Sequence, residues 1–130
     1  MIGGQDARRV RVLIVEDDRR VRAALCGFVS VADGFEVVAA VGDAAQAVDL
    51  ARAHPDAVAL VDLLLPRPDT GLELLRTLTG ELGMPAVALS VRPDLADSAL
   101  AAGACRFVEK HGAPDALLTA LRAAASSSHA

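Results

Sequence analysis

Apolar and polar positions along this chain alternate in blocks, with five short apolar runs separated by segments long enough to form helices. The runs cover residues 10–15, 35–41, 57–61, 86–89 and 107–109. They consist mostly of Val, Leu and Ala with little regular polar alternation, which is typical of strands buried on both faces. Strands that alternate with helices pack as a parallel sheet, so the pattern predicts one α/β domain of five strand-helix units.

The first helix is expected to begin after Asp18, whose side chain can cap it, and to run to about Val31. Val21, Leu25 and Phe28 recur along it at helical spacing and give it one apolar stripe. Another face of this helix carries Arg19, Arg20 and Arg22. That basic face is most simply solvated, although a kinase could dock there.

The second and third helices are bounded by similar local signals. Asp43 can cap the second helix, and His54-Pro55 ends it. Residues 67–71 read as a loop before a Leu-rich third helix. The inner side of that helix is predicted to carry Leu74, Leu75 and Leu78.

The last two helices complete the predicted domain. Asp94 can cap an Ala-rich helix that ends at Gly103, and Pro114 opens the final helix. Its inward positions are Leu117, Leu118 and Leu121. The predicted organisation is a flexible leader, one domain and a flexible tail, at residues 1–8, 9–124 and 125–130.

Composition narrows the classes of function. Aromatic residues make up only 2% of the chain, so the core must be built from Val, Leu and Ala. The formal net charge of -4 argues against direct contact with nucleic acid or an acidic membrane by this domain. Cys26 and Cys105 have no metal-ligand spacing and read as free thiols. No apolar stretch approaches the roughly 20 residues of a membrane span, and a cytoplasmic location is expected.

Residues that can carry chemistry stand where four of the apolar runs end. They are Glu16, Asp17, Asp62, Ser90 and Lys110. Parallel sheets gather such residues at the carboxyl edge of their strands, so the side chains should converge if the runs share one sheet.

Each of these residues also has a simpler structural explanation when it is taken alone. Acidic residues such as Glu16 and Asp17 are favoured near the start of a helix by its macrodipole. Asp62 could be a turn residue, Ser90 could be a cap, and Lys110 could be a solvated residue at a strand end. Their occurrence together, in this order, favours a functional site.

The order and spacing of these motifs resemble the response-regulator receiver domain, the phosphoacceptor module of two-component signalling. The motifs lie within about residues 9 to 124 and are Val-Leu-Ile-Val-Glu16-Asp17-Asp18, Val-Asp62-Leu-Leu-Leu-Pro66, Ala-Leu-Ser90, Gly103-Ala and Phe107-Val-Glu-Lys110. The resemblance implies a flavodoxin-like, doubly wound (βα)5 fold. Its five-stranded parallel sheet would have the order 2-1-3-4-5.

In that strand order, the first and third strands are neighbours about 4.8 Å apart, so Glu16, Asp17 and Asp62 must crowd together. Three carboxylates this close repel one another, and at least one keeps a proton unless a cation joins them. An oxygen-only site of this kind suits Mg²⁺. The resemblance implies that the backbone carbonyl of Leu64 completes the protein ligands.

The resemblance makes Asp62 the phosphoacceptor, and a carboxylate that is already ionised needs no base to attack phosphorus. The donor would be a phosphohistidine of a sensor histidine kinase. Mg²⁺ would neutralise phosphoryl charge while Lys110 holds another oxygen as an electrostatic clamp. The chain is therefore expected to be a regulatory domain, not an enzyme, that catalyses only its own phosphorylation and slow dephosphorylation.

Ser90 and Phe107 are the expected switch residues. The Ser90 hydroxyl would bind a phosphoryl oxygen and draw the following loop inward, and Phe107 would fill the vacated space, which biases a two-state surface. The expected readers of that surface are an output domain or partner protein, with transcription as the controlled process. A homodimer could form on phosphorylation.

Several positions depart from the commonest receiver pattern. The loop after Pro66 reads as one residue longer, and Val91 stands where a small residue is frequent. Leu64 and Arg92 occupy rim positions that tune phosphate lifetime, and the apolar Leu64 predicts slow self-dephosphorylation. His111 follows Lys110 where Pro is usual, which resembles receivers that precede LuxR-type helix-turn-helix domains.

Other functions fit these residues less well. A dehalogenase-like phosphatase would need a second Asp where Leu64 stands, and a nucleotide carrier would need a Gly-rich or hydroxyl-rich loop where Glu16 and Asp17 stand. The serious alternative is a pseudo-receiver, a binding module that works without phosphorylation. Whether the chain acts alone or belongs to a longer DNA-binding regulator stays open.

Overall fold

The computed structural model describes residues 9–127, whose five strands form one parallel sheet in the order β2-β1-β3-β4-β5. The strands are β1 (Val10–Val15), β2 (Phe35–Val41), β3 (Val58–Asp62), β4 (Ala86–Ser90) and β5 (Arg106–Glu109). The helical segments are α2 (Arg19–Val31), α3 (Ala44–Ala53), α4 (Pro68–Arg76), the π-helix η1 (Thr77–Glu81), the 3-10 helix η2 (Pro93–Leu95), α5 (Ala96–Ala101) and α6 (Pro114–Ser127). The predicted fold class and strand order are confirmed.

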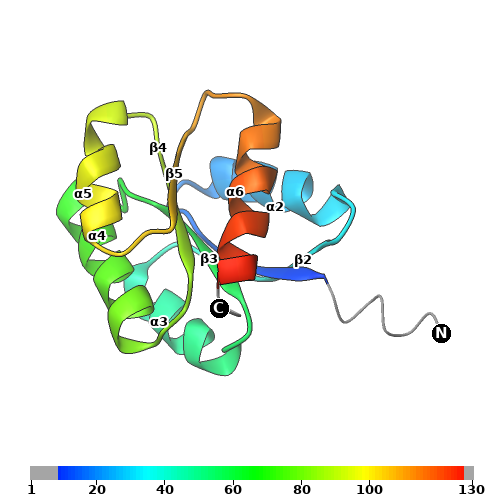
Figure 1. Ribbon diagram of the computed structural model, residues 1–130, viewed down its shortest axis with the longest axis horizontal. Helices are drawn as coiled ribbons and strands as arrows, with labels where there is room; N and C mark the ends of the chain where they lie inside the picture. Colours follow the sequence, from blue (N-terminus) through cyan, green and yellow to red (C-terminus); the bar gives the residue numbers. More distant parts are fainter. Residues whose placement is uncertain (1–8, 128–130) are drawn as a thin grey trace.

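The helices cover the two faces of the sheet as separate layers, with α3, α4 and α5 on one side and α2 and α6 on the other (Figure 1). Successive residues of a strand point to opposite faces, and the central strands follow this rule. In β1, Leu13 and Val15 pack into the first layer, whereas Val12 and Ile14 pack into the second. Both faces of the central strands are therefore buried among aliphatic side chains.

Two predicted helix caps are present. The Asp18 carboxylate accepts hydrogen bonds from the backbone amides of Arg20 and Val21, at 2.9 and 3.1 Å. The Asp43 carboxylate accepts one from the Gln46 amide at 2.8 Å. Each cap satisfies amides that have no partner inside the first turn of the helix, and each fixes where the chain leaves the sheet.

The predicted loop over residues 67–71 is wrong. Helix α4 already begins at Pro68, because the Arg67 carbonyl accepts hydrogen bonds from the amides of Thr70 and Gly71. Proline suits this first helical position, where its missing N–H would have had no partner. Gly71 therefore lies in the first turn of the helix, directly against the backbone of Leu63.

The predicted cap at Asp94 is also wrong. The Asp94 carboxylate instead pairs with the guanidinium of Arg92 at 2.7 Å. The chain enters α5 through the 3-10 turn η2, with Leu95 at the N-cap position and no side-chain cap. A nearby charged partner outcompetes the amides that an aspartate could cap.

The ends of the domain differ slightly from the prediction. Helix α6 continues to Ser127, so residues 125–127 are helical although they were expected to belong to the tail. The predicted leader and the last three residues of the tail, 1–8 and 128–130, lie outside the described residues. Cys26 and Cys105 are free thiols, as expected. Within the part of the chain that the structure describes, each helix is too short or too polar for a membrane span.

Candidate functional site

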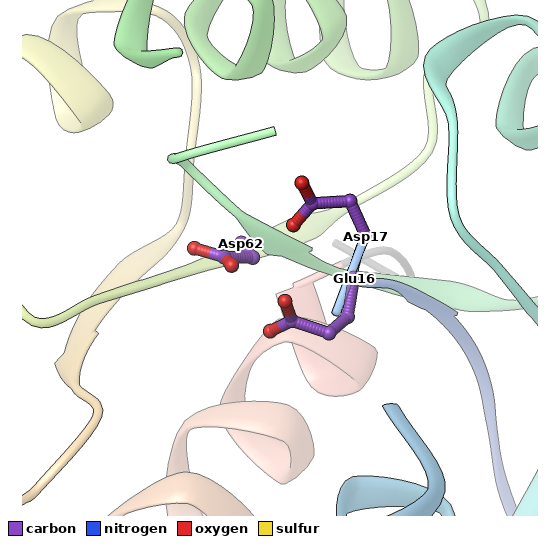
Figure 2. A group of neighbouring side chains, drawn as sticks. All are labelled: Glu16, Asp17 and Asp62. Atoms are coloured by element: carbon purple, nitrogen blue, oxygen red, sulfur yellow. The ribbon is translucent and has the colours of Figure 1, made fainter. Parts of the chain in front are cut away.

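Three carboxyl groups converge at the carboxyl edge of the sheet. Glu16 and Asp17 follow β1, and Asp62 ends β3, which pairs with β1 up to Val15 and Val61. Ligand oxygens of the three residues lie within 4.8 Å of one another. Figure 2 shows the three carboxyl groups turned toward the same space beyond the strand ends. The convergence predicted for these residues is thus present.

The three carboxylates differ in exposure and in backbone contacts. Glu16 is 1% exposed and Asp62 is 3% exposed, whereas Asp17 is exposed. The amide of Leu64 donates to Asp62 Oδ1 at 3.1 Å, and the amide of Asp18 donates to Glu16 Oε2 at 3.2 Å. The two buried carboxylates are therefore oriented by main chain, and the site opens to solvent on the Asp17 side.

Lys110 reaches this group from the far side of β4. Its Nζ atom lies 3.0 Å from Glu16 Oε1 and 3.1 Å from Asp62 Oδ2. The backbone of Lys110 is fixed by a hydrogen bond from its amide to the Ser90 carbonyl at 2.9 Å. Burial lowers the pKa of the ammonium, but the contacts with the two carboxylates outweigh it and leave the pKa above its ordinary value. Lys110 is thus a fixed cation at neutral pH.

The surroundings of Glu16 disfavour the charged form of its carboxyl group. Burial and the neighbouring Asp62 raise the pKa of its carboxyl to about 7, even though Lys110 and the Asp18 amide act in the opposite direction. Its Oε1 atom lies at ion-pair distance from Lys110, yet no described group gives it a well-directed hydrogen bond. The Lys110 ammonium contacts Glu16 and Asp62, and Asp17 adds a third carboxyl group to the same cluster, so the negative groups outnumber the ammonium that pairs with them. This donor set suits a hard divalent cation.

Ser90 and Phe107 occupy the neighbouring strands. Ser90 is fully buried at the end of β4, and its hydroxyl oxygen accepts a hydrogen bond from the Arg92 amide at 3.1 Å. Phe107 lies on β5, is half-buried, and packs against the α3–α4–α5 layer. Ser90 therefore stands at the same sheet edge as the carboxylates, and Phe107 lies further back along its strand.

The rim residues differ in character. Leu64 is half-buried, whereas the side chain of Val91 is 45% exposed. Arg92 is exposed and held by Asp94. An apolar groove runs beside this rim between α2 and the start of α6, and its walls include Val21, Leu25, Phe28, Val91, Val108 and Leu117. The apolar stripe predicted for the first helix is consequently only half-buried.

One contributor to this site was misassigned from the sequence. Arg22 was expected to be a solvated residue of the basic helix face, but it is half-buried and donates from Nη1 to the Glu16 carbonyl at 2.8 Å. Its place on the first turn of α2, four residues after the capping Asp18, turns it back toward the end of β1. Gly42, which directly follows β2, was the sequence signal that could have indicated that another group passes close to the backbone at this point.

Comparison with known proteins agrees with this architecture. Residues 12–122 match the family model described as the response regulator receiver domain. The chain belongs to this family. Receiver domains of response regulators act in two-component signalling and interact with histidine kinases and output domains.

The relatives carry the receiver within longer chains. The chain is 38% identical over 107 residues to protein-glutamate methylesterase/protein-glutamine glutaminase 5 of Anaeromyxobacter dehalogenans (strain 2CP-C), with 82% of this chain and 29% of that protein covered. It is 36% identical over 121 residues to the DNA-binding response regulator MtrA of Mycolicibacterium smegmatis (strain ATCC 700084 / mc(2)155), with 91% and 51% covered. The chain thus spans about half of the length of one of these curated relatives and less than a third of the other.

A solved structure shares the whole fold. The two-component response regulator of the LuxR family from Aurantimonas sp. SI85-9A1 superposes with a TM-score of 0.83 at 28% identity, and 92% of this chain and 86% of that chain are covered. The family predicted from the motifs, including its likeness to receivers of the LuxR type, is confirmed.

Proposed function

We propose that this receiver domain is a phosphoacceptor that takes a phosphoryl group from a histidine kinase onto Asp62. The observation that carries the proposal is the buried Asp62 carboxylate, which lies beside the Lys110 ammonium and within ligand distance of two further carboxylates. Such a group can attack phosphorus only if the charges of the incoming phosphoryl oxygens are neutralised. Lys110 and a divalent cation would supply that neutralisation.

The residues present fit Mg²⁺. Glu16, Asp17 and Asp62 would hold it, together with the backbone carbonyl of Leu64. The shortage of positive charge around Glu16, whose carboxyl has a pKa raised to about 7, supports a cation at this position. When bound, Mg²⁺ supplies positive charge to the phosphoryl oxygens during transfer.

The roles of the chain's own residues follow from their contacts. An oxygen of the Asp62 carboxylate attacks the phosphorus of the kinase phosphohistidine, the new P–O bond forms as the P–N bond breaks, and the imidazole leaves with the electron pair. The Leu64 amide keeps Asp62 Oδ1 in place throughout. Lys110 keeps its proton and holds a phosphoryl oxygen, because its pKa is raised and not lowered. The domain is regulatory, with no separate substrate to turn over.

The output is proposed to follow from Ser90 and Phe107. The Ser90 hydroxyl oxygen already accepts a hydrogen bond from the Arg92 amide. If the same hydroxyl also donates a hydrogen bond to a phosphoryl oxygen, its movement would displace the loop that begins at Val91. Phe107 would then repack and change the surface beside β5. That surface would bind an output domain or partner protein, or a second copy of this chain. The process controlled would be transcription, and the location of the domain would be the cytoplasm.

The receiver domain is proposed to have the limits expected from its sequence. Residues 9–124 would form the working receiver, with α6 continuing to Ser127. No direct contact of this domain with nucleic acid or membrane is proposed, since the net charge is -4.

The test is phosphorylation by a small acyl phosphate in the presence of Mg²⁺, read by intact mass. We expect one added phosphoryl group on the wild-type chain and none when Mg²⁺ is chelated. Asp62→Asn should abolish the adduct. Asp69→Asn, which changes an exposed carboxylate on the first turn of α4, is the matched control and should leave the adduct unchanged. A wild-type chain without an adduct would favour the pseudo-receiver alternative. An adduct that survives Asp62→Asn would place the phosphoryl group on another residue and overturn the role proposed for Asp62.

A further inference from the structure

The carbonyl of Glu16 lies where the ladder between β1 and β2 breaks off. The Glu16 amide still donates to the Val41 carbonyl at 2.9 Å. On the β2 side, the chain then leaves through Gly42 to Asp43, which caps α3 and has turned away from the sheet. Among the described residues, the donor to the Glu16 carbonyl is the Nη1 atom of Arg22, at 2.8 Å. A side chain of α2 thus takes the place of the next ladder hydrogen bond.

Gly42 makes room for this guanidinium. A Cβ atom at position 42 would lie 2.8 Å from Arg22 Nη1 and 3.7 Å from the Glu16 carbonyl oxygen. The backbone conformation of Gly42 is not one that is reserved for glycine, so its missing side chain serves space alone. Arg22 therefore crosses over Gly42 and joins α2, the end of β1 and the end of β2.

The peptide that Arg22 holds is the one between two carboxylates of the site. The carbonyl of Glu16 and the amide of Asp17 belong to a single planar unit, so holding the carbonyl restrains the backbone torsions on either side of it, ψ of Glu16 and φ of Asp17. Figure 2 shows these two side chains leaving the end of β1 on different sides, with their carboxyl groups both turned toward Asp62. Release of this peptide would free those two torsions, on which the relative placement of the two carboxyl groups depends.

We propose that Arg22 is a positioning residue of the cation site, which holds the Glu16–Asp17 peptide so that both carboxylates face Asp62 before a cation arrives. This inference rests on the proposed Mg²⁺ site. It adds that the guanidinium of α2, together with the space left by Gly42, sets the affinity of that site. Groups that orient metal ligands in this way typically change metal affinity by about 10- to 100-fold.

Charge and position predict opposite effects, which makes the inference testable. A guanidinium near a cation site repels the cation, so its removal would strengthen Mg²⁺ binding if charge alone mattered. If Arg22 positions the ligands, its removal weakens binding instead. Arg19, which is exposed on the same helix, offers the matched loss of one positive charge without a contact to the Glu16 carbonyl.

The experiment measures Mg²⁺ dissociation constants by calorimetry for the wild type, Arg22→Gln, Gly42→Ala, the double variant and Arg19→Gln. We expect Arg22→Gln to raise the constant about tenfold or more. Gly42→Ala should also raise it, because the added methyl displaces the flexible end of Arg22 while the charge remains. The double variant should be no weaker than Arg22→Gln alone, since both changes remove the same contact. Arg19→Gln should leave the constant unchanged or lower it.

The controls separate this inference from the proposed function. Thermal unfolding without Mg²⁺ identifies a temperature at which each variant is folded, and Gly42→Ala carries the test if Arg22→Gln does not fold. A wild-type chain that binds no Mg²⁺ contradicts the proposed function itself. A wild-type chain that binds Mg²⁺, with Arg22→Gln and Gly42→Ala binding equally well or better, overturns only the positioning role.

Discussion

Glu16 and Asp17 are adjacent in the chain, yet they meet different surroundings. Glu16 is 1% exposed beneath Lys110, whereas Asp17 is exposed at the mouth of the site. Successive residues at a strand end point to opposite sides, so only one of the two can lie under the ammonium. Protons and cations therefore compete chiefly at Glu16, whose carboxyl has a pKa raised to about 7.

Metal-free protein should lose stability as pH rises from about 5 to about 7. The ordinary pKa of a glutamate is 4.5, and burial raises the folded-state value at Glu16 to about 7. Within this window the folded chain holds a proton that the unfolded chain has released, so raising the pH favours unfolding. Urea unfolding in chelator at several pH values measures the slope. Glu16→Gln should flatten it, and a wild-type stability that rises across the window would contradict the prediction.

Leu64 predicts a long-lived phosphoryl group. Its amide is engaged by Asp62 and its apolar side chain offers no hydrogen bond that could position an attacking water. Leu64→Asn should therefore shorten the lifetime of the adduct. Intact mass, measured at intervals after the phosphoryl donor is removed, gives this lifetime. Leu72 is also a half-buried leucine, but it lies on α4, so Leu72→Asn is the control and should leave the lifetime unchanged. A wild-type lifetime of seconds that Leu64→Asn lengthens would sink this expectation.

At the scale of elements, two connections after strands decide the shape of the site. The turn after β1 is fixed by the Asp18 cap, and the segment after β3 is fixed from behind by α4, whose first turn brings Gly71 against Leu63. The Leu63 amide also bonds to the Leu89 carbonyl at 3.0 Å, which ties this segment to β4. The backbone that carries Asp62 is thus held on both sides.

Gly71→Ala should destabilise the domain by about 1–3 kcal/mol, because the new methyl overlaps the Leu63 backbone, which cannot move aside cheaply. Gly27→Ala is the matched control, since no atom lies within 4 Å of a Cβ at that position on α2. It should stabilise the domain by about 0.5–1 kcal/mol through helix propensity. Denaturant unfolding measures both, and equal effects of the two changes would contradict the close packing of α4 on Leu63.

Helix limits were predictable where a local signal acts alone. Asp18 and Asp43 cap their helices because each carboxylate has amides two or three residues ahead, and among the described residues neither carboxylate forms a salt bridge that competes with them. Asp94 has the same local sequence signal, but Arg92 captures it. The start of α4 escaped prediction because Gly71 reads as a turn residue, whereas its absent side chain serves packing against Leu63.

At the scale of the whole molecule, one sheet order accounts for most of the candidate site. Once the runs are known to be parallel neighbours, Asp62 and Glu16 must meet at one edge, and Lys110 must face them across β4. These placements were predictable because they depend only on where strands end. The contact of Arg22 over Gly42 was not, because it depends on the rotation of α2 against the sheet.

Mg²⁺ should stabilise the entire fold and not merely the site. The proposed ligands come from β1 and β3, and a cation that binds only when these strands are paired shifts the unfolding equilibrium of the domain. Mg²⁺ at 100 times its dissociation constant should add about 2.7 kcal/mol. For a domain of this size, that corresponds to a rise of roughly 10 °C in the unfolding midpoint.

Thermal unfolding with Mg²⁺ and with Na⁺ at matched ionic strength measures this gain. Asp17→Asn should remove most of it, because it deletes a ligand that is exposed and does not support the core. Asp69→Asn should keep the gain, since that carboxylate belongs to the first turn of α4 and lies outside the cluster. Equal midpoints in the two salts would mean that the three carboxylates meet without forming a cation site. The buried Glu16 carboxyl would then avoid the cost of its negative charge by protonation alone, as its raised pKa allows.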